Sequence, residues 1–252
     1  MFVEGRLLMK SSSRDALFWN ARYKVIGEAY TPCGIGTLAE KTVHKVLKFY
    51  IEPDEKNHEV NYLGYVADIM NSDGIYEIQT RSAERLIPKL ERFLKDTKVT
   101  VVFPVIVQKY IRRLDKSTGE ISEPRKSPKK ESAYTALGEV YKIRRFLGNP
   151  NLKIMLVFLE ADEYKIIGGS PKGFRASDKI PTVILGQMRL DSKSDFSVLV
   201  PEGLGEQFLA SDFAKAAKIQ KKHIFCVMNV LSSLGVISRV GKKGNAYVYV
   251  LQ

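Results

Sequence analysis

The chain has 252 residues, of which 44% are hydrophobic, so it is long enough to bury a full core. Its 40 Lys and Arg residues exceed its 28 Asp and Glu residues by twelve, which favours a polyanionic partner. No apolar run reaches the roughly 18 residues of a membrane span, residues 1–20 lack the apolar centre of a signal peptide, and the two cysteines lack metal-ligand spacing. We therefore expect a soluble, cytoplasmic protein with free thiols and no membrane partner.

The first informative segment is 36–50, where apolar residues recur at helical spacing and predict an amphipathic helix. Glu40 lies three residues before Val43 and seven before Leu47, which places an acid on or beside the buried stripe of that helix. Buried carboxylates are costly unless they are paired or bound to a cation. Glu40 is therefore a candidate site residue, with pairing to a neighbouring lysine as the alternative.

A short strand at 59–63 is followed by a predicted β-hairpin at 64–80, because Asp73-Gly74 lies between two short apolar runs. If these two residues form the loop, Met70 pairs with Glu77 and Asp68 pairs with Gln79. Any loop with an even number of residues keeps Asp68 and Glu77 on one face, whereas a three-residue loop would separate them. The polar face then holds Asp68, Met70, Glu77 and Gln79, and the apolar face holds Ala67, Ile69, Tyr76 and Ile78.

Asp68 and Glu77 are candidate metal ligands. As diagonal neighbours they would lie about 7–8 Å apart at the backbone, close enough for their side chains to converge on one ion. A hard cation such as Mg²⁺ prefers oxygen ligands and usually takes only one or two carboxylates from the protein. Such an ion can polarise a phosphate and lower the pKa of a bound water. The alternative is a solvated polar face of the hairpin.

After the hairpin, an amphipathic helix is predicted at 82–95 and a fully buried strand at 99–107. This order of helix, three strands, helix and strand, with Glu40 on the first helix and Asp68-x8-Glu77-x-Gln79 on the hairpin, resembles the PD-(D/E)xK nuclease superfamily of restriction-endonuclease-like and Holliday-junction-resolvase-like enzymes. The resemblance implies a nuclease domain over 1–168. Its fold would be α/β (α+β), with a mixed central sheet and flanking helices.

The same resemblance implies the roles of the site residues. Asp68 and Glu77 would be the metal-binding carboxylates, and Glu40 would contact the site through metal or water. Gln79 stands where the superfamily usually has Lys, and it offers neutral hydrogen bonds in place of a positive charge. In this interpretation Gln79 orients the attacking water.

The middle of the chain has weaker patterns. Residues 106–113 and 119–122 predict a hairpin, residues 131–147 a helix, and residues 152–159 a second buried strand of the same sheet. We expect residues 169–204 to connect two domains.

The C-terminal region, 205–252, predicts helices at 212–218 and 222–233 and strands at 236–240 and 246–250 around a basic turn. This order resembles a winged helix-turn-helix domain, with the second helix in the position of the recognition helix. A winged helix used for protein contacts is the alternative. Candidate nucleic-acid contacts are Gln220, Lys221, Lys222 and His223 at the helix start, and Lys242 and Lys243 at the wing.

Positive charge is concentrated in two segments. Between Lys109 and Lys130 there are eight basic and three acidic residues, and from Phe213 to Gln252 there are seven basic residues and no acids. Together these segments account for the whole excess of positive charge. Phosphate contacts of this kind give salt-dependent binding with little sequence information. Further candidate contacts in the first segment are Arg125, Lys126, Lys129 and Lys130.

These patterns lead to the hypothesis of a Mg²⁺-dependent endonuclease that hydrolyses phosphodiester bonds in double-stranded or branched DNA, with Mn²⁺ as an alternative ion. A catalytically inactive DNA-binding regulator with the same fold and an RNA-directed nuclease are the alternatives. Because nucleases that cut both strands are often dimers, a homodimer is one arrangement that the resemblance allows.

Overall fold

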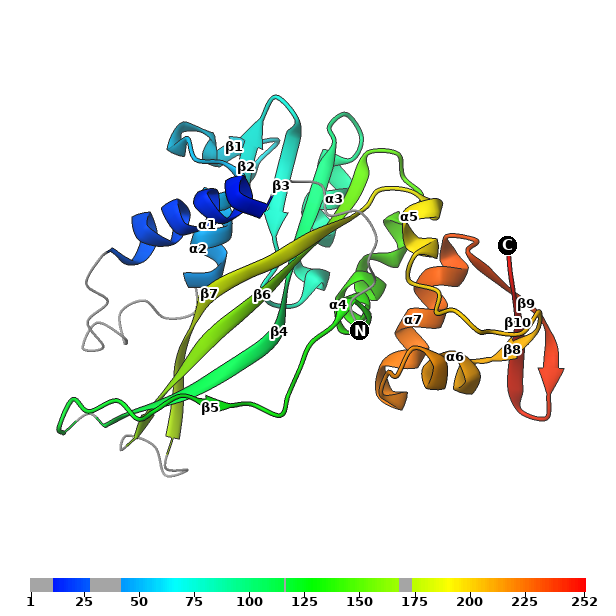
Figure 1. Ribbon diagram of the computed structural model, residues 1–252. Helices are drawn as coiled ribbons and strands as arrows, with labels where there is room; N and C mark the ends of the chain where they lie inside the picture. Colours follow the sequence, from blue (N-terminus) through cyan, green and yellow to red (C-terminus); the bar gives the residue numbers. More distant parts are fainter. Residues whose placement is uncertain (1–10, 28–41, 116, 168–173) are drawn as a thin grey trace.

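The computed structural model describes residues 11–27, 42–115, 117–167 and 174–252. It is a mixed α/β structure in which helices flank a seven-stranded sheet, with a smaller three-stranded sheet near the C-terminus (Figure 1). The strands of the large sheet are β1 (His58–Tyr62), β2 (Tyr65–Asn71), β3 (Gly74–Ile78), β4 (Val99–Asp115), β5 (Arg125–Lys126), β6 (Leu152–Ile167) and β7 (Phe174–Leu190). The expectation of a mixed central sheet with flanking helices is confirmed.

The large sheet has the order β1-β2-β3-β4-β6-β7, with β5 paired to the far half of β4. Strands β1, β2 and β3 form an antiparallel meander, whereas β3, β4 and β6 run parallel. A parallel connection needs a crossover, and helices supply both. The first crossover is η3 (Ala83–Leu86) and α3 (Ile87–Phe93), and the second is α4 (Ala133–Val140) and η4 (Tyr141–Phe146).

Each face of the sheet is covered by its own helices. Helices α1 (Ser11–Ile26) and α2 (Thr42–Ile51) pack against one face, where Phe18 and Leu47 join Ile69 and Val102 in one apolar cluster. Helix α2 buries Val43, Val46, Leu47 and Tyr50, which is the helical spacing predicted from the sequence. The other face is covered by α3 and α4. The continuous apolar run from Val99 is buried because both faces of β4 are covered.

Strand β7 differs from the expectation that residues 169–204 connect two domains. Residues 174–190 instead pair antiparallel with β6 along nearly its whole length. The register of this pairing shifts at three places, so apolar and polar residues do not alternate regularly in the sequence of β7. Only the short helix α5 (Lys193–Ser197) and the loops beside it lie between this strand and the C-terminal unit.

The C-terminal unit consists of β8 (Phe208–Leu209), α6 (Ala210–Ala216), α7 (Lys221–Ser233), β9 (Ile237–Lys243) and β10 (Ala246–Leu251). Its sheet has the order β8-β10-β9, and Gly244-Asn245 form the turn between the last two strands. Helix α7 packs against α4, and one apolar cluster includes Leu137 of α4 together with Phe213 and Val227 of the C-terminal unit. The two units therefore share a hydrophobic core.

Candidate active site

The β2–β3 hairpin brings Asp68 and Glu77 together, as the even-loop argument predicts. The loop is Ser72-Asp73, because Asn71 pairs with Gly74 and Ile69 pairs with Tyr76. The paired residues end at Ile69 and Tyr76, and Asp68 and Glu77 are the next residue on each strand, close enough for the charge of Asp68 to raise the pKa of Glu77. The expected register, in which Met70 faced Glu77 and Asp68 faced Gln79, was wrong by two residues, because the loop begins one residue earlier than expected. The expected apolar face is kept for Ile69, Tyr76 and Ile78, whereas Ala67 lies in the apolar cluster on the other side of the sheet.

A backbone hydrogen bond ties the carboxylate of Asp68 to the opposite strand of the hairpin. Oδ2 of Asp68 accepts a hydrogen bond from the backbone N–H of Ile78 at 2.8 Å. This bond fixes the Asp68 side chain relative to β3, the strand that carries Glu77.

Lys89, on the crossover helix α3, forms the closest charged contact with this pair. Its Nζ donates to Oε1 and Oε2 of Glu77 at 2.9 and 2.8 Å, and to the carbonyl oxygen of Val66 at 2.6 Å. The Glu77 side chain is only 2% exposed, whereas the Lys89 side chain is 22% exposed. The ammonium group of Lys89 therefore contacts the buried carboxylate of Glu77 and is itself partly exposed to solvent.

The two carboxyl groups have opposite pKa shifts. Burial raises the pKa of Glu77, the negative charge of Asp68 raises it further, and Lys89 only partly opposes them, which leaves a pKa of about 7. Burial also acts to raise the pKa of Asp68, but contacts with His44, the N–H of Ile78 and the charge of Lys89 together hold it below its usual value. Near neutral pH, Asp68 is therefore ionised while Glu77 exchanges a proton, the kind of split that acid–base sites use.

His44 reaches the same site from α2 on the other side of the hairpin. Its Nε2 lies 3.2 Å from Oδ2 of Asp68, and the side chains are 21% and 15% exposed. Helix α2 and helix α3 thus each contribute one polar side chain, and the hairpin contributes two, to one cluster: His44, Asp68, Glu77 and Lys89.

Gln79 lies just beyond the end of β3, and its amide is used locally. Nε2 donates to the carbonyl oxygen of Ser82 at 3.1 Å, and Oε1 accepts from the N–H of Arg81 at 3.0 Å. These bonds shape the turn that leads from β3 to the helix carrying Lys89. These bonds place the amide of Gln79 at the turn, and its role of orienting water stays a prediction.

The other predicted residues fall into two groups. Glu40 lies outside the described residues. The remaining candidates for nucleic-acid contact are exposed on β5 and its following loop, at the start of α7 and on β9, except that His223 is half-buried. They are Arg125, Lys126, Lys129, Lys130, Gln220, Lys221, Lys222, Lys242 and Lys243.

Lys89 and His44 were not predicted as members of this site. A signal for Lys89 is nevertheless present, because it lies three residues after Leu86 and four before Phe93, both of which are buried. A charged residue at that spacing faces inward, which is the argument that identified Glu40. The sequence gives no comparable signal for His44.

The carboxylate pair has the donor chemistry of a site for a hard cation. In the described part of the chain no group of three or more His, Cys, Asp and Glu residues is arranged to hold a metal, but Mg²⁺ needs only one or two protein carboxylates. Burial is the largest cause of the raised pKa of Glu77 and repulsion from Asp68 adds to it; a divalent cation between the two carboxylates would relieve that repulsion. Lys89 already contacts both oxygens of Glu77, so an ion there would share this carboxylate with the ammonium group.

A family model described as "Domain of unknown function (DUF8091)" matches residues 41–191, more than half of the chain. The chain belongs to the DUF8091 family. The DUF8091 match starts one residue before α2 and ends one residue after β7, so it contains the whole polar cluster and every strand of the large sheet. Inclusion of β7 agrees with its pairing in the structure.

The chain is also similar to an uncharacterized protein of Treponema pallidum (strain Nichols), at 29% identity over 223 residues. The alignment covers 85% of this chain and 86% of the relative, so the similarity extends beyond the DUF8091 region. No solved structure matches the chain. Among the residues that the structure describes, none of the helices has the length and apolar character needed to cross a membrane.

Proposed function

We propose that this protein is a metal-dependent nuclease that hydrolyses phosphodiester bonds in DNA. The observation that carries the proposal is the pair Asp68 and Glu77, brought together by the hairpin, with a lowered pKa on one and a pKa of about 7 on the other. The hairpin continues through a crossover helix into a parallel strand, and this order supports the resemblance to the PD-(D/E)xK superfamily.

In the proposed reaction, Asp68 and Glu77 are the residues that would hold Mg²⁺. A bound Mg²⁺ would supply a polarised phosphate and a water of lowered pKa. Asp68 stays ionised near neutral pH, so it retains its negative charge for the cation. Glu77 can take up or release a proton at the same pH. By resemblance to the superfamily, water would attack the phosphorus in line with the leaving oxygen, and the products would carry 5′-phosphate and 3′-hydroxyl ends.

Lys89 supplies the positive charge that Gln79 lacks. Its ammonium group contacts Glu77 and is 22% exposed, so a phosphate beside the carboxylates lies within reach of a small side-chain movement. A cation placed there stabilises charge that develops on the phosphoryl oxygens. Gln79 has the supporting role of shaping the turn before the helix that carries Lys89.

DNA is the proposed substrate because the exposed positive charge lies on β5 with its loop, at the start of α7 and on β9. The C-terminal order of strand, two helices and hairpin supports a winged helix-turn-helix assignment, with α7 as the recognition helix. On β9, Arg239 lies 4.4 Å from the ring centre of Tyr247, which presents a basic and aromatic surface beside the wing turn.

A second candidate function is a DNA-binding protein without nuclease activity. It is favoured by the contact of Lys89 with both oxygens of Glu77, since a buried ion pair of this kind can be purely structural. In that case the acids stabilise the hairpin and DNA binding is retained.

A cleavage assay on duplex, single-stranded and branched DNA and on RNA, with Mg²⁺ or Mn²⁺, separates the candidates. The nuclease proposal predicts cleavage of a DNA substrate by the wild type and its loss in Asp68→Asn and Glu77→Gln. Glu84→Gln, which changes an exposed acid of the neighbouring turn, is the matched control and keeps full activity. Binding without cleavage in all variants supports the second function, and cleavage of RNA alone supports an RNA-directed nuclease.

A further inference from the structure

Strands β4, β6 and β7 extend past the helices as an arm, which lies at the lower left in Figure 1. The part of β4 from Gln108 to Asp115 belongs to this arm and spans roughly 25 Å at the usual rise of a strand. On it, Arg113 pairs with Lys165 of β6, and Ile111 pairs with Arg125 of β5. Because paired residues and residues two apart share a face, all four side chains project from one face of the arm.

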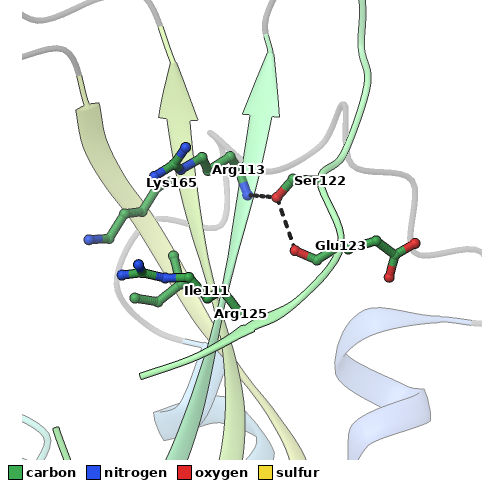
Figure 2. A pocket seen from close by; sticks show the side chains of 6 residues that line it. All are labelled: Ile111, Arg113, Ser122, Glu123, Arg125 and Lys165. Carbon is green, nitrogen blue, oxygen red and sulfur yellow. Dashed lines mark hydrogen bonds between the residues drawn. The ribbon is translucent and has the colours of Figure 1, made fainter. Parts of the chain in front are cut away.

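These side chains line a pocket of about 310 Å³, together with Ser122 and Glu123. In Figure 2 Arg113, Arg125 and Lys165 extend to the same side of β4, whereas the carboxylate of Glu123 points away from them. A hydrogen bond of 3.0 Å from the N–H of Arg113 to Oγ of Ser122 ties the loop to β4. The pocket therefore has a fixed backbone frame and three convergent basic side chains.

The acid nearest to this cluster along the strand is already paired. Glu163 lies two residues before Lys165 on β6, and its Oε2 is 2.9 Å from Nζ of Lys109. Within the described residues, neither Arg125 nor Lys165 forms an ion pair. The charges of Arg125 and Lys165 are thus not neutralised by an acid of the described residues.

The opposite face of the arm carries a small apolar core beside the ion pair of Arg112 and Asp162. Leu114, Tyr164 and Ile180 are buried there in a small core of their own. This core fixes the orientation of the strands, so the basic residues at the alternate positions stay on the outer face.

We infer that the pocket lined by Arg113, Arg125 and Lys165 binds phosphates of the DNA backbone. Arginine presents a planar fork of donors that matches phosphate oxygens, and lysine adds a mobile point charge. A polymer of phosphates suits the site better than a single phosphate, because the basic surface continues from the pocket into the loop that carries Lys129 and Lys130. This inference rests on the proposed function, since it makes the arm the surface that holds the DNA substrate.

The test is the salt dependence of duplex DNA binding, measured by fluorescence anisotropy with EDTA present so that no cleavage occurs. The arm variant is Arg113→Gln/Arg125→Gln/Lys165→Gln. The matched control is Arg92→Gln/Lys95→Gln/Lys98→Gln, which removes three exposed positive charges near the end of α3 and the start of β4. Thermal unfolding of both variants establishes that each is folded.

We expect the slope of log K against log salt to fall by about 2–3 in the arm variant, since each lost phosphate contact contributes about 0.9. The control keeps the wild-type slope. Equal slopes in the two variants overturn the inference. Displacement of DNA from the wild type by equimolar inorganic phosphate also overturns it, because the pocket would then take single phosphate groups.

The two proposals fail in different ways. A slope effect of the arm variant without any cleavage by the wild type rejects the nuclease and keeps the arm as a DNA-binding surface. Cleavage by the wild type with unchanged salt dependence in the arm variant rejects the arm and keeps the nuclease.

Discussion

Replacement of Glu77 by Gln tests the electrostatics of the carboxylate pair. Glu77 is 2% exposed and has a pKa of about 7, against 4.5 for an ordinary glutamate. Because its pKa is raised in the folded state, the folded protein binds this proton more tightly than the unfolded chain does. The stability contributed by the protonated form is therefore complete below pH 4.5 and is lost as the pH rises through 7.

The size of this loss follows from the shift. Each pKa unit corresponds to about 1.4 kcal/mol, so the whole effect is roughly 3 kcal/mol. Gln cannot ionise. Relative to the wild type, the free energy of unfolding of Glu77→Gln should thus increase by roughly 2–3 kcal/mol between about pH 5 and pH 8. The lowered pKa of Asp68 acts at more acid pH, so it does not contribute to this change.

The assay is urea unfolding at four pH values across that range, for the wild type, Glu77→Gln and the control Glu84→Gln. The ion pair with Lys89 is already included in the pKa of Glu77, because it forms only when Glu77 is ionised. Any other cost of Glu77→Gln is the difference between a Gln and a protonated Glu side chain, which does not depend on pH. The change with pH, and not the absolute difference, is therefore the predicted quantity. A difference between Glu77→Gln and wild type that stays constant from pH 5 to pH 8 would show that the pKa of Glu77 is not raised in the folded protein.

Three further predictions concern the surroundings of the site. Lys89→Met should raise the pKa of Glu77 above 7 and move the loss of stability to higher pH, and an unchanged midpoint would contradict the ion pair. Gly74→Ala should lower the free energy of unfolding by about 1–3 kcal/mol, because φ is +123° and a Cβ would lie 2.5 Å from the carbonyl oxygen of Lys98; a neutral result in urea unfolding would contradict that approach. Leu137→Ala should cost about 2–5 kcal/mol, and calorimetry should show both units unfolding in one transition, since this residue is fully buried in their shared core; two separate transitions would argue against it.

The hairpin shows which parts of the site the sequence could predict. Side chains along a strand alternate between its two faces. Any loop with an even number of residues therefore predicted that Asp68 and Glu77 share a face. The register did not follow, because Gly74 was taken as a turn residue. Its positive φ instead accommodates the carbonyl oxygen of Lys98 on the neighbouring segment, and that approach depends on tertiary structure.

Longer-range features were harder to predict from the sequence. Strand β7 carries Pro181 and Gly186, and its pairing with β6 shifts register, so its sequence resembles a loop more than a strand. The apolar runs beginning at Val99 and Leu152 predicted only the buried halves of β4 and β6, because their outer halves alternate and are more polar. The arm pocket depends on the pairing of these outer halves, which the sequence alone does not reveal.

The positions of the helices were predicted from the sequence, but the division of some of them into 3₁₀ and α-helical parts was not. The helical spacing of Val43, Val46, Leu47 and Tyr50 predicted α2. The apolar residues along one face of α7 predicted that helix. The predicted helix at 82–95 is divided into η3 and α3, with Pro88 in the first turn of α3, where a missing N–H costs little. Lys89 still faces inward despite this division, because it keeps its helical spacing from the buried residues Leu86 and Phe93.

In the proposed nuclease, Asp68 and Glu77 would hold the Mg²⁺ needed for hydrolysis of phosphodiester bonds. Its most direct test is the single-turnover cleavage rate of a labelled duplex with Mg²⁺, compared between the wild type and Asp68→Asn. We predict a rate that falls by about 100-fold or more in Asp68→Asn, and that is abolished in the wild type by EDTA. Equal rates in the two proteins, or no cleavage by a wild type that binds the duplex, would contradict the claim.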